Sequence, residues 1–172
     1  MSNGRRILVF SSDESLKILA RARTILGDGT FRVTPSLWYQ TFIISAEVDE
    51  AVFVPVMFAL LPDKRQTTYE DMFGIIKDCL NSRSAELFMS DFEVGIRNGF
   101  SLHFPEVAVK GCHFHMAKAF WKRVVNKGFK TVYSDSKNHP KFGGFIRACI
   151  GIAYCPLNRL SEALEGFKFL AN

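Results

Sequence analysis

Hydrophobic and polar positions follow two different periods along the chain, and these periods predict its elements. An amphipathic stretch covers residues 13–22. Beyond it, apolar runs with period-two alternation indicate three consecutive strands, at residues 24–33, 37–46 and 51–60. Thr34-Pro35-Ser36 and the polar residues 47–50 separate these strands as turns. Three strands connected in this way form a meander.

Helical and strand periods then alternate. Thr67 is expected to cap a helix, with Glu70 completing a capping box, and apolar residues at helical spacing continue to Leu80. The next predicted elements are a strand at 85–91, a helix at 94–104, a strand at 106–114 and a helix at 116–125. The order β-β-β-α-β-α-β-α predicts an α/β fold with a mixed five-stranded sheet flanked by helices. It resembles the order of ribonuclease-H-like nucleases and transposases.

Composition narrows the class of protein. The chain has 172 residues, of which 48% are hydrophobic and 17 are Phe, so it can bury a core and is not globally disordered. The longest apolar run, residues 51–61, contains Pro55 and is too short to cross a bilayer. The N-terminus lacks the apolar run of a secretory signal, and four irregularly spaced cysteines do not form a disulfide framework. An intracellular protein with no membrane partner is expected.

Charge is distributed unevenly. The net charge is +5, but residues 1–109 carry a net of −3, whereas residues 110–147 carry nine basic residues against Asp135. Aromatic residues are interleaved with this basic block, as in surfaces that bind nucleic acid. A solvated helix face is the alternative interpretation. The residues expected to contact DNA phosphates are Lys118, Lys122, Arg123, Lys127 and Lys130.

Asp28 lies between two glycines in the first predicted strand. Asp-Gly between apolar runs is a hairpin signal, but the turn at residues 34–36 makes a second turn here unnecessary. In an extended strand Asp28 shares a face with Leu26 and Thr30. Gly27 and Gly29 would then leave the backbone beside the acid open to a large substrate. Asp28 is therefore a candidate site residue.

Asp91 ends the fourth predicted strand, where open α/β sheets place their ligands. If the first and fourth strands are neighbours, Asp28 and Asp91 converge across 63 residues of sequence. Two close carboxylates repel each other unless a cation lies between them, so a hard divalent metal is the expected partner. The alternative is that Asp91 only caps the next helix.

Cys112 and His115 have the C-x-x-H spacing of zinc ligands. A structural zinc site needs four ligands, and Cys149 and Cys155 would complete the set with an unusual gap. We therefore favour a metal-free buried thiol beside a hydrogen-bonded imidazole. His113 is expected to alternate out of phase on the strand at 106–114, in a structural or exposed role.

An ordered series of motifs is similar to the Mutator-like (MULE) transposase domain over about residues 20–170. The motifs are D-G-T-F (28–31), P-V-M-F-A-L-L (55–61), T-T-Y-E-D-M-F (67–73), S-D-F-E (90–93), F-P-E-V (104–107), G-C-H-F-H (111–115) and the stretch 153–170. The resemblance implies a DDE-type catalytic core that cuts and transfers DNA strands in the nucleus with two Mg²⁺ or Mn²⁺ ions. It makes Asp28 and Asp91 the first two acids and Cys112 and His115 the family's C-x-x-H motif. It also implies DNA as partner and a possible homo-oligomeric transposition complex.

The sequence departs from the family pattern at the third acid, a glutamate expected beyond a helical insertion. Glu162 and Glu165 read as part of that insertion. We therefore expect a fragment with a lead-in at 1–23, a catalytic core at 24–125 and an incomplete helical insertion at 126–172. A domesticated, non-catalytic DNA-binding or regulatory protein is the first alternative. A host exonuclease is the second, but the D-x-E of such enzymes would place its glutamate where Thr30 stands.

Overall fold

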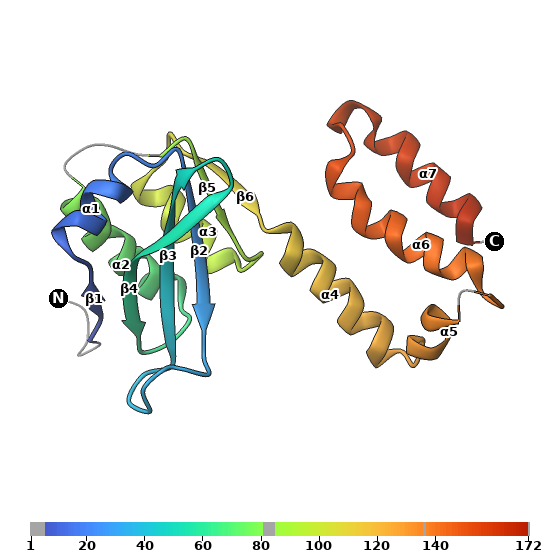
Figure 1. The fold of residues 1–172 in the computed structure, drawn as a ribbon, viewed down its shortest axis with the longest axis horizontal. Helices are drawn as coiled ribbons and strands as arrows, with labels where there is room; N and C mark the ends of the chain where they lie inside the picture. Colours follow the sequence, from blue (N-terminus) through green and yellow to red (C-terminus); the bar gives the residue numbers. More distant parts are fainter. Residues whose placement is uncertain (1–5, 81–84, 136, 172) are drawn as a thin grey trace. The chain divides into compact units, whose positions relative to one another are not determined.

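A six-stranded sheet organises the first part of the chain in the computed structural model, which describes residues 6–80, 85–135 and 137–171 (Figure 1). Its spatial order is β1-β4-β3-β2-β5-β6. β2, β3 and β4 form an antiparallel meander, whereas β5 and β6 run parallel to β2. The strands are β1 (Leu8–Phe10), β2 (Thr24–Thr30), β3 (Gln40–Asp49), β4 (Val52–Leu61), β5 (Leu87–Ser90) and β6 (Ala108–Gly111).

The element order predicted from residue 24 to the helix after β6 is observed, but the five-stranded sheet is wrong. The additional strand is β1, which pairs antiparallel with β4 and precedes the elements predicted from the sequence. Three residues are too few to establish a period, so alternation could not reveal this strand. The sheet is therefore mixed, as expected, with six strands.

Pro55 lies inside β4, where it would normally interrupt a ladder of hydrogen bonds. It faces Ser45 at a point where the register of β3 and β4 shifts. On its other side β4 pairs with β1 only from Phe58 to Leu60. The missing N–H of Pro55 therefore falls at an irregularity of the pairing.

The described residues of this part of the chain form three helices: α1 (Asp13–Leu19), α2 (Gln66–Cys79) and α3 (Val94–His103). α2 and α3 pack against each other, and Phe73 of α2 is fully buried. Its ring makes edge contacts with Phe42 of β3, Phe88 of β5 and Phe100 of α3. Aromatic packing of this kind fixes the sheet against both helices.

The start of α2 differs from the expected capping box. Its N-cap residue is Arg65, with no side-chain cap bond, so Thr67 is already inside the helix. Asp63 instead holds the loop that leads into the helix, because its Oδ1 accepts from the Arg65 backbone N (3.0 Å) and from the Thr68 hydroxyl (2.6 Å). Glu70 accepts from the Gln66 side chain at 2.8 Å. An acid upstream of the helix thus fixes the approach of the chain to α2.

Residues 113–172 form a separate helical unit, and residues 1–112 contain the sheet. The helices of the second unit are α4 (His113–Asn126), α5 (Lys130–Ser134), α6 (Pro140–Gly151) and α7 (Leu160–Ala171), with 3-10 turns η1 (Ile152–Tyr154) and η2 (Leu157–Arg159). α6 contacts α4, α5 and α7. The helix expected at 116–125 is observed as α4, which is longer than predicted at both ends. None of the described helices is long and apolar enough to cross a membrane.

Candidate functional site

The two candidate acids come from neighbouring parallel strands. β2 and β5 pair in parallel, and Gly27 lies opposite Ser90. Asp28 and Asp91 are the next residue on each strand: Asp28 lies inside β2, two residues before its end, and Asp91 directly follows β5. The expectation that the first and fourth predicted strands are adjacent is confirmed. The Asp28 side chain is exposed and that of Asp91 is half-buried.

The two glycines beside Asp28 serve the core rather than a substrate. A Cβ on Gly27 would lie 2.7 Å from the Phe88 ring, and one on Gly29 would lie 2.6 Å from Gln40 Oε1. Successive side chains of a strand point to opposite faces. The glycines therefore face the packed side of the sheet, and Asp28 points the other way. The interpretation that they open the backbone to substrate is wrong.

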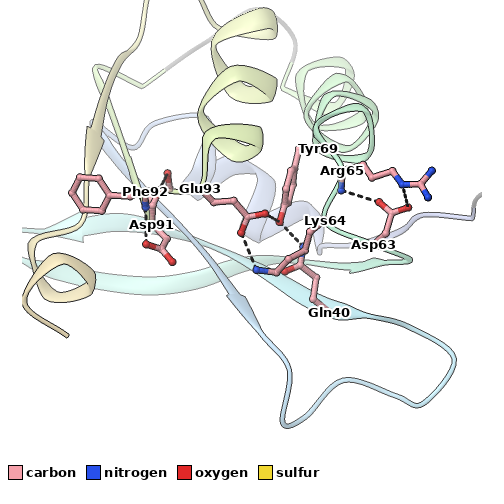
Figure 2. Close-up of polar contacts among 9 residues, drawn as sticks. Gln40, Asp63, Lys64, Arg65, Tyr69, Asp91, Phe92 and Glu93 are labelled. Atoms are coloured by element: carbon pink, nitrogen blue, oxygen red, sulfur yellow. Dashed lines mark hydrogen bonds and ion pairs between the residues drawn. The ribbon is translucent and has the colours of Figure 1, made fainter. Parts of the chain in front are cut away.

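Asp91 is fixed by its own backbone neighbours at the end of β5 (Figure 2). Its Oδ1 accepts a hydrogen bond from the Phe92 backbone N at 2.6 Å, and the Ser90 hydroxyl donates to the Asp91 carbonyl at 3.1 Å. The N-cap residue of α3 is Glu93, which lies two residues later. Asp91 is therefore not the cap of α3, and the capping alternative is wrong for this residue.

Glu93 is a residue of this edge that the sequence did not single out. Figure 2 shows its carboxylate directed toward Lys64 and Tyr69, away from Asp91. The Tyr69 hydroxyl donates to Oε1 at 3.0 Å, and Lys64 Nζ donates to Oε2 at 2.9 Å. Gln40 Nε2 in turn donates to the Tyr69 hydroxyl at 2.7 Å. This network connects β3, the β4–α2 loop, α2 and the β5–α3 junction.

Burial sets the protonation state of the network. Tyr69 and Gln40 are almost completely buried. Burial, together with the neighbouring Glu93 carboxylate, raises the pKa of the Tyr69 phenol well above its ordinary value. The Tyr69 hydroxyl therefore remains a donor to Glu93 at every ordinary pH. Glu93 is held as an ion-paired carboxylate two residues from Asp91.

The C-x-x-H residues are divided between two elements. Cys112 follows β6. Its backbone N donates a hydrogen bond at 2.7 Å to the carbonyl of Ser90, the residue before Asp91. His115 lies in the first turn of α4. Cys149 is a buried thiol on α6, where burial raises its pKa, and Cys155 follows η1.

His113 does not lie on a strand as expected, because β6 ends at Gly111 and His113 begins α4. Its Nε2 lies 3.2 Å from the Ile150 carbonyl, and its ring lies 4.7 Å from that of Tyr154. It is a packing residue of the helical unit.

The predicted phosphate-binding residues are all exposed. Lys118, Lys122 and Arg123 lie on α4. Lys127 follows α4, and Lys130 begins α5. Glu162 and Glu165 lie on α7, where Glu162 pairs with Arg159 at 3.0 Å. The basic residues therefore form one solvent-facing stretch of the helical unit.

The family model of the MULE transposase domain matches residues 24–119, more than half of the chain. This chain belongs to the MULE transposase domain family. No curated protein and no solved structure matches it.

The MULE match contains both candidate acids, the C-x-x-H residues and Lys118. It ends within α4, so the remaining basic residues and the helices α5 to α7 lie outside it. The MULE-matched part thus begins with β2 and runs to the first basic residue of α4. Transposase-related function is the functional class that this family indicates.

The side chains of Asp28 and Asp91 can be compared with the ligands that divalent metal ions prefer. Carboxylate oxygens are the ligands that Mg²⁺ and Mn²⁺ prefer, and two strands supply two of them side by side. Among the residues that the structure describes, no group of three or more His, Cys, Asp or Glu is placed to hold a metal ion. Asp28 and Asp91 are two carboxylates of the chemical type that binds such ions. The described chain does not supply a third acid there.

Proposed function

We propose that this chain is the ribonuclease-H-like, DDE-type catalytic core of a MULE transposase, which cuts and transfers DNA strands in the nucleus. The observation that supports the proposal is the register of β2 and β5, in which Asp28 and Asp91 each follow the Gly27–Ser90 pair. The family match over residues 24–119 supports it. We further propose that the chain acts within a homo-oligomeric transposition complex.

The roles of the residues follow from their chemistry. Asp28 and Asp91 would hold divalent Mg²⁺ or Mn²⁺, which would supply Lewis-acid activation for phosphodiester hydrolysis and strand transfer. The exposed cations of α4 and α5 would bind DNA phosphates and position the duplex without reading its sequence. Glu93 would keep the Asp91 segment in place through Tyr69 and Lys64.

A second candidate function is a non-catalytic DNA-binding or regulatory role. The observation in its favour is that no third acidic ligand joins Asp28 and Asp91 among the described residues. Two carboxylates hold a metal pair poorly, so strand cleavage by this chain would be weak. DNA binding through the basic residues does not depend on the acids.

Nicking of supercoiled plasmid in the presence of Mn²⁺ tests the catalytic proposal. We expect weak nicking that disappears in Asp28→Asn and in Asp91→Asn. Asp78→Asn is the matched control, because Asp78 is an exposed acid on α2 and its loss should leave nicking unchanged. Nicking that survives both site changes contradicts the catalytic role. DNA binding without any nicking by the unaltered chain favours the regulatory role.

A further inference from the structure

The loop at residues 31–39 leaves β2 directly after the strand that carries Asp28. Thr34 ties this loop to both flanking strands: its hydroxyl donates to the Thr30 carbonyl at 2.9 Å and accepts from the Thr41 backbone N at 2.8 Å. At its far end, the Tyr39 backbone N donates to the Leu61 carbonyl at 2.9 Å. The two ends of the loop are therefore held at the edge of the sheet.

This anchored loop presents two aromatic side chains to solvent. Phe31 is 48% exposed and Tyr39 is 54% exposed. Their ring centroids are 5.8 Å apart, with an interplanar angle of 79°. Lys64 Nζ lies 4.9 Å from the Phe31 ring centroid, and Glu93 holds the same ammonium group. The result is an exposed aromatic pair with a cation fixed beside it, which we call the Phe31–Tyr39 pair.

We propose that the Phe31–Tyr39 pair binds an unpaired nucleobase of the DNA strand whose phosphate lies at Asp28 and Asp91. This inference rests on the proposed function and deepens it, because it assigns a subsite for a single-stranded part of the substrate. Exposed aromatic rings beside a cation are the means by which proteins hold unstacked bases, since every base has a flat π-face. Lys64, held by Glu93, keeps its ammonium group beside the Phe31 ring.

The short stretch of chain between Asp28 and Phe31 is compatible with this occupant. Phe31 lies three residues after Asp28, so their Cα atoms are at most about 11 Å apart. One strand of B-DNA advances about 3.4 Å per nucleotide, so a base within about three nucleotides of the cut phosphate can reach the pair. Arg32, the residue after Phe31, is exposed, whereas the charge of Lys64 is balanced by Glu93. The Arg32 cation favours nucleic acid over an apolar protein segment.

Two DNA probes of the same duplex sequence, one blunt and one with a three-nucleotide unpaired overhang, test the inference with the full chain in EDTA. Fluorescence anisotropy at fixed salt gives the two dissociation constants. We expect the overhang probe to bind at least about fivefold more tightly, and Phe31→Ala to remove that preference while affinity for the blunt probe stays unchanged. Phe31→Trp should keep the preference.

Two control variants exclude simpler explanations. Phe31→Leu keeps an apolar side chain but lacks a ring, so it should behave like Phe31→Ala. Leu37→Ala removes the most exposed apolar side chain of the same loop, at 91% exposure, and should leave both affinities unchanged. Circular dichroism of each variant establishes that the fold is retained.

The possible outcomes separate this inference from the proposed function. Binding of both probes with equal affinity, or an overhang preference that survives Phe31→Ala, overturns the inference and leaves the proposed function standing. An equal loss in Leu37→Ala overturns it as well, because the loop would then be a general apolar contact. If the unaltered chain binds neither probe, both proposals fail.

Discussion

Gly27 and Asp28 are adjacent residues with opposite requirements, because one faces the packed rings of the core and the other faces solvent. A Cβ at Gly27 would lie 2.7 Å from the Phe88 ring and 2.9 Å from that of Phe42, both fully buried. We predict that Gly27→Ala lowers the free energy of unfolding by about 1–3 kcal/mol through overpacking. Urea denaturation followed by circular dichroism measures the loss.

Gly144→Ala is the control for this change. Gly144 lies inside α6, and a Cβ there would meet nothing within 4 Å. Alanine in a helix is favoured over glycine by about 0.5–1 kcal/mol, so this variant should be neutral or slightly more stable. A Gly27→Ala protein as stable as the unaltered chain would contradict the packing of β2 against Phe88.

Tyr69 is the buried centre of the network that holds Glu93. Tyr69→Phe removes the donor to Glu93 and the acceptor for Gln40, and leaves both of those groups incompletely paired. We predict a loss of about 1–3 kcal/mol in the free energy of unfolding. Tyr154→Phe, at a position that is 74% exposed, should change it by less than about 0.5 kcal/mol. Equal effects at the two positions would argue against the network.

The raised pKa of Tyr69 gives the network a pH dependence. Tyrosine in the unfolded chain ionises near pH 10, whereas buried Tyr69 keeps its proton to higher pH. The native state thus binds more protons above about pH 10, so its stability is complete below that pH and falls as pH rises. We predict that the stability difference between the unaltered chain and Tyr69→Phe shrinks between about pH 9 and about pH 11. A constant difference over that range would contradict this prediction.

At the scale of elements, the start of α2 can be explained by either of two residues, Thr67 or Asp63. The sequence favours Thr67 as cap, whereas in the structure α2 begins after Arg65 and Asp63 holds the loop before it. We predict that Asp63→Ala lowers the free energy of unfolding by about 1–3 kcal/mol, because it removes two hydrogen bonds at the start of the helix. Thr67→Ala should be neutral, because Thr67 is exposed within the helix. A larger loss at Thr67 in the same denaturation measurement would restore the capping box.

Elements with long regular patterns were predictable from the sequence. The meander, α2 and the alternation that follows it carry enough apolar positions to reveal their period. Because parallel strands end at the same edge, even the neighbourhood of Asp28 and Asp91 followed from the order of elements. Boundaries were less predictable: β6 ends at Gly111, three residues before the expected end, and His113 already belongs to α4.

The Glu93 network could not be predicted, because tertiary packing creates it. Gln40, the Lys64–Tyr69 segment and Glu93 come from three separate stretches of the sequence. Only the shared edge of β3, β4 and β5 brings them together. The S-D-F-E segment was the one available signal, since it places a second acid two residues after Asp91.

At the scale of the whole molecule, charge is divided between the two units. Residues 1–112 carry 12 basic and 14 acidic residues, and residues 113–172 carry ten basic and three acidic residues. The sheet unit is therefore slightly acidic, whereas the helical unit has a net charge of +7. Attraction to DNA is expected to be local to the helical unit.

Salt dependence measures that attraction. If about four basic residues contact phosphates, log K for duplex DNA should fall with log salt at a slope near about −3.6. Replacing Lys118, Lys122, Arg123 and Lys127 together with Ala should flatten this slope and weaken all duplex sequences alike. Asp28→Asn serves as the control and should leave binding intact or slightly stronger. Binding that ignores salt, or that survives the fourfold change, would mean that the basic stretch is only a solvated face.

The glycines on either side of Asp28 also protect the alignment of the sheet against slippage. A shift of β2 by one residue relative to β5 would turn every side chain of the strand over. The Asp28 carboxylate would then enter the space beside Phe88, and Ile25 would emerge into water. Both changes are costly, so the Gly-Asp-Gly triplet admits one alignment and rejects its neighbours. An apolar residue in place of Asp28 would therefore weaken the discrimination between the two alignments, while the glycines would still keep side chains out of the space beside Phe88 and Gln40.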